Sequence, residues 1–208
     1  MNIAIIGSGH MAHGIGTRIV AGNHPLTIYD RTPEKAQELA KTLGGDTQAE
    51  ALSEALKGDV IVFALPYAAN LELVGKYSEQ LADKIVVDIS NPVNFQTFEL
   101  IPPPGTSGVE EIAKLLPVGA KIVKAFNTTF AGTLVAGQVD GKKLDVFIAG
   151  DDEDAKKTIK QLVEDGGLRG IDAGPLSRAR HLEGFQLIQM ASQQTPGTNW
   201  MSAIKILP

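Results

Sequence analysis

The order of apolar and polar positions divides the chain into short apolar runs and longer periodic segments. Runs of mostly apolar residues occur at 2–6, 59–65, 84–89, 121–125 and 146–150. Continuous apolarity is typical of strands that are covered on both faces, as in a parallel sheet. Between these runs, apolar residues recur every three or four positions, which is typical of amphipathic helices. The alternation predicts an α/β protein with a doubly wound, mostly parallel sheet.

Capping residues and glycines mark where the predicted helices begin and end. Thr32 before Pro33 suits a helix start, and the glycines at 44–45 would stop that helix. Either Thr106 or Ser107 can cap a later helix. The expected helices begin near Gly9 and after Asp151 or Asp152, and cover about 33–43, 68–81, 109–116 and 177–193.

Two stretches depart from the regular alternation. Residues 90–108 form a long, proline-rich connection, and long loops inside compact domains are usually functional or mobile. Residues 48–56 form a short amphipathic segment between the second and third predicted strands. The first of these stretches follows a predicted strand end, where ligands of such folds bind.

The predicted helix 177–193 has an apolar stripe. Its spacing places Leu182, Phe185 and either Ile188 or Gln189 on the side that faces the domain. We therefore expect this helix to pack on the sheet through these residues.

The C-terminal part of the chain is predicted to extend the sheet domain rather than to form a second domain. Residues 195–208 contain the only Trp, Trp200, among several apolar residues, so this tail must fold back or pack on another subunit. We favour the second option in part. The prediction is a single domain over 1–208, with a dinucleotide-binding core at 1–150 and an extension at 151–208 that contacts a second subunit.

Composition narrows the class of protein. Of the 208 residues, 43% are hydrophobic and 21% charged, and the net charge of −5 comes without an acidic or basic block. Neither a nucleic acid nor an anionic membrane surface is therefore an expected partner. The absence of Cys excludes disulfides and thiolate chemistry. Met1 is followed at once by the first strand and no 18-residue apolar run occurs, so we expect a cytoplasmic protein without a membrane segment.

The loop after the first apolar run has a dinucleotide-binding pattern. In such a loop Gly7 would make the tight turn, Gly9 would let backbone approach a pyrophosphate, and Ala12 would permit close packing of helix on strand. The alternative is a turn that serves packing alone. A Rossmann cradle is favoured because a strand precedes the loop and a helix follows it. The residues expected to hold the phosphates are Gly7, Ser8, Gly9, His10 and Met11.

The end of the second predicted strand bears on the choice between NAD and NADP. Asp30 at this position would bind ribose hydroxyls and favour NAD. Arg31 and Lys35 would bind a 2′-phosphate, and Thr32 adds a hydroxyl. We favour NADP(H) because two cations outweigh one acid that could rotate away, and NAD(H) stays open. Thr32 can equally be only a helix cap, and Lys35 only a solvated side chain.

Other polar residues carry weaker signals. His10 and His13 have a spacing that could bind metal, but no third ligand is near in sequence, so no metal site is expected. His10 is more readily explained as facing the phosphates or the nicotinamide. Asp151 and Asp152 are interpreted as a helix cap and a first-turn acid. Glu183 is expected to form a structural ion pair.

Several motifs together resemble a known family, the NADPH-dependent reductases of the deazaflavin coenzyme F420, with their bacterial relatives. They occur in family order along nearly the whole chain, at 7–14, 65–66, 90–92, 106–111, 124–128, 150–152, 172–176 and 179–183. The same domain resembles the cytoplasmic part of STEAP metalloreductases and the first domain of pyrroline-5-carboxylate reductases. One departure is Asp30, where the family has Ser before Arg.

The resemblance implies hydride transfer between NADP(H) and a deazaflavin or flavin-like ring. This chemistry needs positioning more than acid or base catalysis, so no catalytic side chain is expected. With the apolar tail in mind, we expect the protein to be a homodimer. Four residues are expected beside the nicotinamide: Leu65, Pro66, Asn91 and Pro92. Four are expected beside the acceptor: Pro92, Phe126, Asn127 and Thr128.

Three alternatives stay open. The chain could bind NADP(H) as a sensor or scaffold without turnover, or reduce another small substrate. A 3-hydroxyacid dehydrogenase or imine reductase is disfavoured, because these enzymes need a long helical second domain and only about sixty residues follow Gly150.

Overall fold

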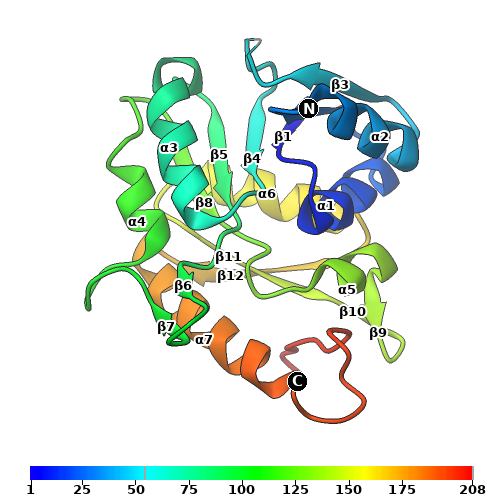
Figure 1. Cartoon of the computed structure of the whole chain (residues 1–208), viewed down its shortest axis with the longest axis vertical. Helices are drawn as coiled ribbons and strands as arrows, with labels where there is room; N and C mark the ends of the chain where they lie inside the picture. The colour runs from blue at the N-terminus through cyan, green and yellow to red at the C-terminus, as the bar shows by residue number, and fades with distance from the viewer. Residues whose placement is uncertain (54, 208) are drawn as a thin grey trace.

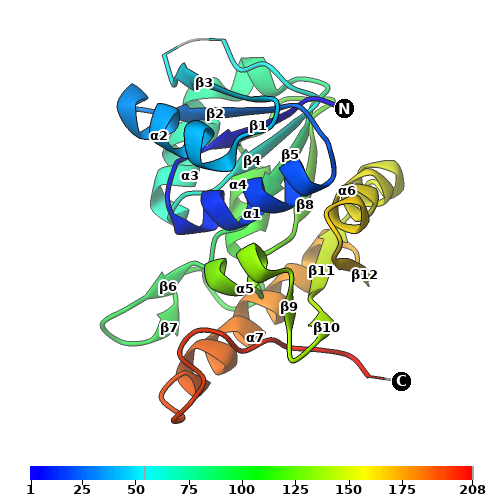
Figure 2. The ribbon, with the colours of Figure 1, turned by 90° about the vertical axis from the view of Figure 1, so that its right-hand side faces the viewer.

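Within residues 1–53 and 55–207, which the computed structural model describes, the central feature is an eight-stranded sheet with helices on both faces (Figures 1 and 2). In spatial order the strands are β12 (Arg169–Gly174), β11 (Asp145–Gly150), β8 (Lys121–Lys124), β5 (Ile85–Asp88), β4 (Val60–Phe63), β1 (Ile3–Ile6), β2 (Leu26–Asp30) and β3 (Thr47–Ala51). Neighbours from β3 through β8 pair in parallel, as do β11 and β12, whereas β8 and β11 pair antiparallel. The predicted mostly parallel, doubly wound sheet is confirmed.

The strand order reverses at β1. From β1 the chain winds outward to β2 and β3, then crosses back to place β4, β5 and β8 on the other side of β1. In sheets of this kind a crevice opens beyond the carboxyl ends of the strands at such a reversal. The loops that follow β1, β2 and β4 therefore meet at one edge of the sheet.

Helices cover the two faces of the sheet (Figure 2). Their bounds are α1 (His10–Ala21), α2 (Pro33–Leu43), α3 (Tyr67–Tyr77), α4 (Gly108–Ala113), α5 (Ala131–Ala136), α6 (Glu153–Asp165) and α7 (Ala179–Ser192). Short 3-10 turns extend α3 at Ser78–Leu81 and precede α7 at Leu176–Arg178. The helices predicted at 33–43, 68–81, 109–116 and 177–193 are present with shifts at their ends.

The continuous apolarity of the strands has a simple cause. In β1, Ile3 and Ile5 belong to a core shared with α1, α2 and α6, while Ala4 and Ile6 belong to a second core under α3. Because successive side chains point to opposite faces of a sheet, a strand covered on both faces needs apolar residues throughout.

The helix caps follow the sequence signals in part. The hydroxyl of Ser107 accepts a hydrogen bond from the Glu110 N–H at 3.3 Å, and Asp152 Oδ1 accepts one from the Ala155 N–H at 2.7 Å. Ser107 and Asp152 are therefore the caps among the alternatives considered. Thr32 stands at the start of α2, but its side chain makes no capping hydrogen bond.

Several elements were not assigned from the sequence. The first part of the amphipathic segment 48–56 lies in the edge strand β3, because it pairs in parallel with β2. The long connection 90–108 contains a hairpin of β6 (Val93–Asn94) and β7 (Glu99–Leu100). Helix α5 and a second hairpin, β9 (Gln138–Val139) with β10 (Lys142–Lys143), lie between β8 and β11.

The orientation predicted for α7 is wrong in part. Leu182 and Gln189 are buried as expected, but Phe185 is 40% exposed and Ile188 66% exposed. Polar side chains, Glu183 among them, take the inward positions instead. Leu182 packs on Phe147 and Ala149, whereas Glu183 turns inward to meet the buried Lys124 at the end of β8, so the stripe is only partly covered.

The tail folds back on the domain. Asp145 Oδ2 accepts a hydrogen bond from the Ile206 N–H at 2.9 Å, and Lys205 Nζ lies 2.7 Å from Asp145 Oδ1. Trp200 packs edge-on against Phe130 with ring centroids 5.1 Å apart, yet remains 55% exposed. In the part of the chain that the structure describes, no helix has the length and apolarity needed to cross a membrane.

Candidate functional site

The glycine loop after β1 is built for close approach of backbone to backbone. Gly7 has φ +108°, a conformation that L side chains rarely adopt. A Cβ added there would lie 2.8 Å from Leu65 Cδ2 and 2.9 Å from the Ala64 carbonyl oxygen. Gly7 therefore permits the tight contact between the end of β1 and the end of β4.

Gly9 serves a different purpose. A Cβ added at Gly9 would meet nothing within 4 Å, and its φ of −78° suits any residue. The open space lies at the start of α1, whose first turn contains no acidic residue and no side-chain cap. Free N–H groups and the positive end of the helix dipole make this position suited to a phosphate.

Small residues also let α1 pack closely, as predicted for Ala12. Ala12 is fully buried. A second small residue, Gly14, was not singled out from the sequence. A Cβ there would lie 2.8 Å from Leu134 Cβ and 2.9 Å from the Ala131 carbonyl oxygen, so Gly14 brings α5 against α1. The segment after β8 is thereby held beside the glycine loop.

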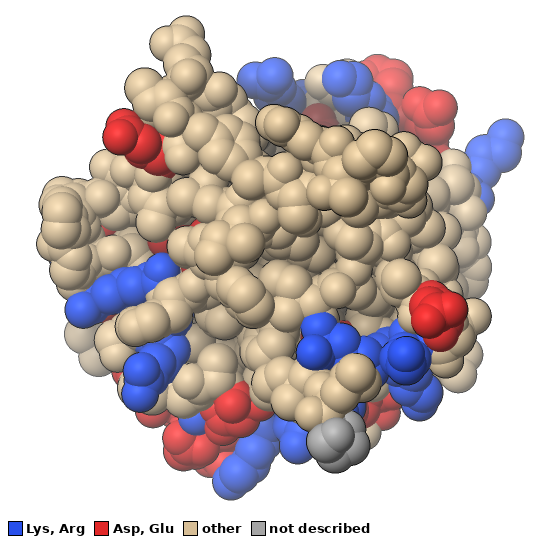
Figure 3. Space-filling view, turned by 90° about the horizontal axis from the view of Figure 1, so that it is seen from below, with Lys and Arg blue, Asp and Glu red and all other residues tan. Residues whose placement is uncertain are grey.

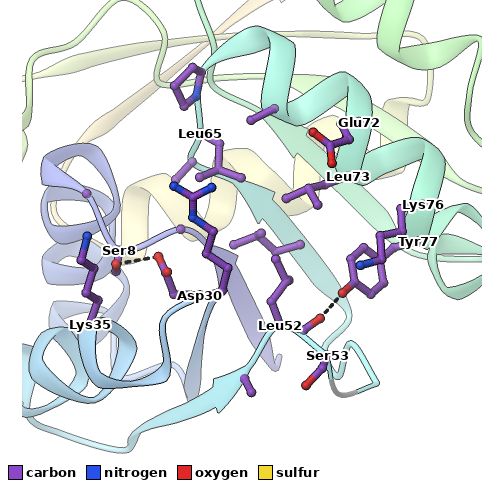
Figure 4. A pocket seen from close by; sticks show the side chains of 18 of the residues that line it. Ser8, Asp30, Lys35, Leu52, Ser53, Leu65, Glu72, Leu73, Lys76 and Tyr77 are labelled. Carbon is purple, nitrogen blue, oxygen red and sulfur yellow. Dashed lines mark hydrogen bonds between the residues drawn. The ribbon is translucent and has the colours of Figure 1, made fainter.

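A cavity of about 810 Å³ lies between the glycine loop, the end of β2 and α3 (Figure 4). Eight of the predicted cofactor residues line it: Gly7, Ser8, Gly9, Asp30, Arg31, Lys35, Leu65 and Pro66. Further lining residues were missed from the sequence, namely Leu52 and Ser53 after β3 and Leu73, Lys76 and Tyr77 on α3. Only pairing of β3 with the sheet brings that segment opposite α3, so no local signal could have found them.

Asp30 is held in place within this cavity. Ser8 Oγ donates a hydrogen bond to Asp30 Oδ2 at 2.7 Å, and the Thr32 N–H donates one to Asp30 Oδ1 at 2.8 Å (Figure 4 shows the first). In this structure the acid is therefore held at the cavity and is not rotated away. Both carboxylate oxygens already have a protein donor, which leaves Asp30 as a brace for the turn that carries Arg31.

The cations expected beside a 2′-phosphate lie at the cavity wall. Arg31 and Lys35 are exposed and line the cavity. Thr32 does not line it, and its side chain is half-buried. The residues present thus fit a dinucleotide: a phosphate-binding loop with open space in front of Gly9, and two cations beyond the end of β2.

The loops after β5 and β8 are joined to each other. The side-chain amide of Asn91 donates to the Asn127 carbonyl at 3.0 Å, and that of Asn127 donates to Asn91 Oδ1 at 3.0 Å. Phe126 has φ +62°, which is uncommon for a bulky residue. Strained backbone of this kind clusters at ligand sites.

The predicted acceptor residues form a buried group. Pro92, Phe126, Asn127 and Thr128 are all buried and do not line the 810 Å³ cavity. Within residues 1–53 and 55–207, Asn127 Oδ1 and Thr128 Oγ1 make no hydrogen bond. Buried polar atoms are rarely left unpaired, so these two atoms stand out, but both are inaccessible to solvent in this structure.

Three charged side chains that the sequence did not place together lie beneath these loops. Lys124, Asp88 and Glu183 are buried, and Lys124 Nζ lies 2.7 Å from Asp88 Oδ2 and 2.8 Å from Glu183 Oε1. Burial by itself would lower the pKa of Lys124, but the two carboxylates raise it above its usual value. The expected structural ion pair of Glu183 is confirmed, with Lys124 as its partner.

The remaining predicted residues lie near the glycine loop. His10, the first residue of α1, is exposed, and Met11 is half-buried. Among the described residues no group of three or more His, Asp or Glu side chains is placed to hold a metal ion.

Fold and site together define a dinucleotide-binding protein of the Rossmann class. A family model described as NADP oxidoreductase, coenzyme F420-dependent, matches residues 2–92. The F420-dependent NADP reductase of Methanocaldococcus jannaschii is 33% identical over 202 residues, which cover 88% of this chain and 88% of that protein. The chain belongs to the family of F420-dependent NADP reductases, and it is an NAD(P)-dependent oxidoreductase.

Other similarities agree with this assignment. The metalloreductase STEAP3 of Rattus norvegicus is 31% identical over 93% of this chain, which spans 38% of that protein. A crystal structure of a proposed F420-dependent NADP reductase from Arthrobacter sp. FB24 has a TM-score of 0.84 and 26% identity, with 99% of each chain covered. A pyrroline-5-carboxylate reductase from Coxiella burnetii, with TM-score 0.60 and 18% identity over 93% of this chain and 71% of its own, shares the fold alone. The predicted resemblances are confirmed.

Proposed function

We propose that this chain transfers hydride between NADP(H) and a deazaflavin, with a flavin-like ring as the second choice of acceptor. The observation that carries the proposal is the open space at Gly9 beside a cavity lined by Arg31 and Lys35. The nicotinamide supplies the hydride chemistry, so the protein has to bind and align two rings. The acceptor follows from the activity named for the relative that is 33% identical.

The cofactor would lie along the strand ends from β2 to β5. Backbone N–H groups at the start of α1, including those of His10 and Met11, would bind the pyrophosphate. Arg31 and Lys35 would bind the 2′-phosphate, beside Asp30 and Thr32. The nicotinamide would lie against Leu65 and Pro66 and against the loop that carries Asn91 and Pro92.

The acceptor would contact the loop after β8. Its support is the strained backbone at Phe126 together with the unpaired Asn127 Oδ1 and Thr128 Oγ1. Both atoms are buried, so they would bind polar edges of a planar ring only after the loop shifts. Pro92 would lie between the two rings' binding positions. No side chain is assigned as a general acid or base, because hydride passes directly between the rings.

The proposal is tested by mixing the purified protein with NADPH and the deazaflavin and following the absorbance of both. We expect oxidation of NADPH matched by reduction of the deazaflavin, and weaker NADPH binding by Arg31→Ala. Lys41→Ala is the matched control, since Lys41 is an exposed cation on α2 outside the cavity. Turnover with FMN but not with the deazaflavin would show that the acceptor is a flavin. Tight NADPH binding without turnover on any ring would favour a sensor or scaffold.

We also propose that the protein is a homodimer whose contact includes the outer face of α7. Phe185 and Ile188 are three positions apart and exposed on this helix. No charged residue occurs between Glu183 and Lys205. The view from below, onto α7 and the β6–β7 hairpin, has a broad uncharged centre with charged side chains around it (Figure 3). An exposed apolar stripe on one helix can pack on its own copy across a two-fold axis.

Light scattering after size exclusion tests the dimer. We expect twice the chain mass for the wild type and a monomer for Ile188→Glu, because a charge at the centre of an apolar contact is costly. Val118→Glu is the control, since Val118 is 99% exposed and lies in the loop between α4 and β8 rather than on α7. A monomeric wild type would refute the proposal.

A cytoplasmic location is likewise proposed. The absence of Cys is compatible with a reducing compartment. Fractionation of the host cell with an antibody against the chain would test it, and recovery in the secreted fraction would contradict it.

A further inference from the structure

The buried ammonium of Lys124 has all of its hydrogen-bonding capacity committed. Its Nζ donates to Asp88 Oδ2 at 2.7 Å, to Glu183 Oε1 at 2.8 Å and to the Ser90 carbonyl oxygen at 2.6 Å. An ammonium group has three donors, so each is used once. Lys124 thus joins β5, α7 and the loop after β5 at a single nitrogen atom.

Both carboxylates of this group are themselves held by further donors. Asp88 Oδ1 accepts hydrogen bonds from Asn70 Nδ2 and from Ser90 Oγ, each at 2.8 Å. Glu183 Oε2 accepts one from the Gly108 N–H at 3.0 Å, at the start of α4. A fully satisfied buried polar network of this kind specifies one arrangement of its members. The Lys124 network, meaning Lys124, Asp88 and Glu183, therefore fixes elements that are far apart in the sequence.

Ser90 is the residue of the loop that forms hydrogen bonds with the network. Its hydroxyl is bound by Asp88 and its carbonyl by Lys124. The next residue, Asn91, is bound on its other side by the reciprocal amide pair with Asn127. The backbone that leads into Pro92 is consequently held at Ser90 by the Lys124 ammonium and at Asn91 by two hydrogen bonds to Asn127.

The third anchor of Lys124 comes from outside the dinucleotide cradle. Glu183 lies on α7, on the side opposite the exposed Phe185, because residues two apart on a helix do not face each other. Helix α7 is thereby connected to the loop at 90–92 through the Glu183 carboxylate and the Lys124 ammonium. None of the hydride chemistry requires this charge, so its use is geometric.

We propose that Lys124 is a positioning residue for hydride transfer: anchored by Asp88 and Glu183, it fixes the Ser90 carbonyl and so sets the Asn91–Pro92 wall against which the nicotinamide and the acceptor ring align. The kinetic part of this inference rests on the proposed function. The mechanical part, that Glu183 on α7 restrains residues 88–93, does not.

The test compares Glu183→Gln with Gln189→Ala. The first keeps the size of the side chain, but its amide must point a donor at either the Lys124 ammonium or the Gly108 N–H. Gln189 is the matched control, because it is 4% exposed on the same helix and makes a hydrogen bond to the Ser202 carbonyl, outside the network. If Glu183→Gln does not fold, Glu183→Asp, which keeps the charge but shortens the side chain, takes its place in both measurements.

Hydrogen exchange of the free protein gives a readout that needs no acceptor. We expect peptides spanning 88–93 to exchange faster in Glu183→Gln than in the wild type, with no such change in Gln189→Ala. Equal exchange in all three proteins would overturn the inference even if the wild type reduces a deazaflavin.

Kinetics give the second readout. For Glu183→Gln we expect kcat with the acceptor to fall about tenfold to a hundredfold, as for a misplaced reacting pair, while the Kd of NADPH stays within about twofold. The isotope effect with deuterated NADPH should rise, because hydride transfer becomes more nearly rate-limiting. An unchanged isotope effect, or a parallel loss of NADPH binding, would mean a general structural defect and overturn the inference. A wild type without any acceptor activity would instead refute the proposed function and leave the exchange result to stand.

Discussion

The two glycines at the ends of the phosphate loop should respond in opposite ways to the same small substitution. Gly7→Ala places a methyl group 2.9 Å from the Ala64 carbonyl oxygen and forces an alanine to φ +108°. Gly9→Ala meets nothing within 4 Å at an ordinary φ of −78°. The first change should therefore damage the fold, and the second only the binding of the cofactor.

The magnitudes follow from these contacts. For Gly7→Ala, overpacking costs about 1–3 kcal/mol and the strained backbone about 1–3 kcal/mol more. Since 1 kcal/mol corresponds to about 2–4 °C in a chain of this size, Tm should fall by at least about 4 °C. For Gly9→Ala, the lower entropy of the unfolded chain contributes about 0.4–1 kcal/mol, and the poorer N-cap costs a similar amount, so Tm should hardly change.

Cofactor binding separates the variants further. If Gly9 faces the pyrophosphate, its new methyl group should remove one hydrogen bond to a charged group, worth about 1.5–3 kcal/mol, and weaken NADPH binding about tenfold to a hundredfold. NADPH at about 100 times the wild-type Kd stabilises the wild type by about 2.7 kcal/mol, but a variant that binds tenfold more weakly by only about 1.4 kcal/mol.

The assay is a melting curve with and without NADPH, together with a fluorescence titration for Kd. Gly75→Ala is the control, because Gly75 lies on α3 with open space around it and does not line the cavity. Wild-type affinity in Gly9→Ala would show that the pyrophosphate does not lie against Gly9. An unchanged Tm in Gly7→Ala would refute the argument from the close approach of β1 and β4.

Two further predictions concern charged groups. Asp30→Ser should raise the preference for NADPH over NADH about tenfold, because it removes a carboxylate near the 2′-phosphate, whereas Ser8→Ala should shift the preference toward NADH because Asp30 Oδ2 loses its protein donor. Both effects are measured as the ratio of the Kd values for NADPH and NADH, with Glu34→Ser as a control for net charge. Unchanged ratios would show that Asp30 does not belong to the site. Burial raises the pKa of Asp145, but its bonds to Arg169, Lys205 and the Ile206 N–H outweigh burial and lower the pKa below its usual value, so the tail contact should be complete above about pH 4 and be lost as pH falls through the lowered pKa. Trp200 fluorescence should report this loss, and an acid-insensitive signal in a protein that stays folded by circular dichroism would contradict it.

Much of the cradle was predictable because its determinants are local. Ile3 to Ile6 had to be a strand covered on both faces, Gly7 had to make the turn, and the two cations after Asp30 had to lie at the end of the next strand. Each inference uses a spacing of a few residues. The mostly parallel character of the sheet also followed from the alternation of strands and helices, but the order of the strands did not.

Helix α7 shows where local reasoning stops. Its apolar period is correct, but the rule that an apolar stripe faces inward holds only in part, because Leu182 packs on apolar core while Glu183 turns inward to the buried Lys124. A pattern along one helix has no information about the polarity of its partner. The same limit explains why β3, which has no buried residue, was recognisable only once β2 offered it an edge.

The amino-acid sequence on its own therefore determined that the chain is a Rossmann domain with a glycine loop at Gly7 to Gly9 and an acid beside a cation at Asp30 and Arg31. It could do so because strand burial, turns and helix starts depend on neighbours within a few positions. Only the tertiary structure decided that Ser8 holds Asp30, that β3 and α3 close one cavity, and that Glu183 reaches Lys124 across 59 positions of chain. Those contacts depend on which strand ends meet at one edge of the sheet, and no periodicity along the chain encodes that meeting.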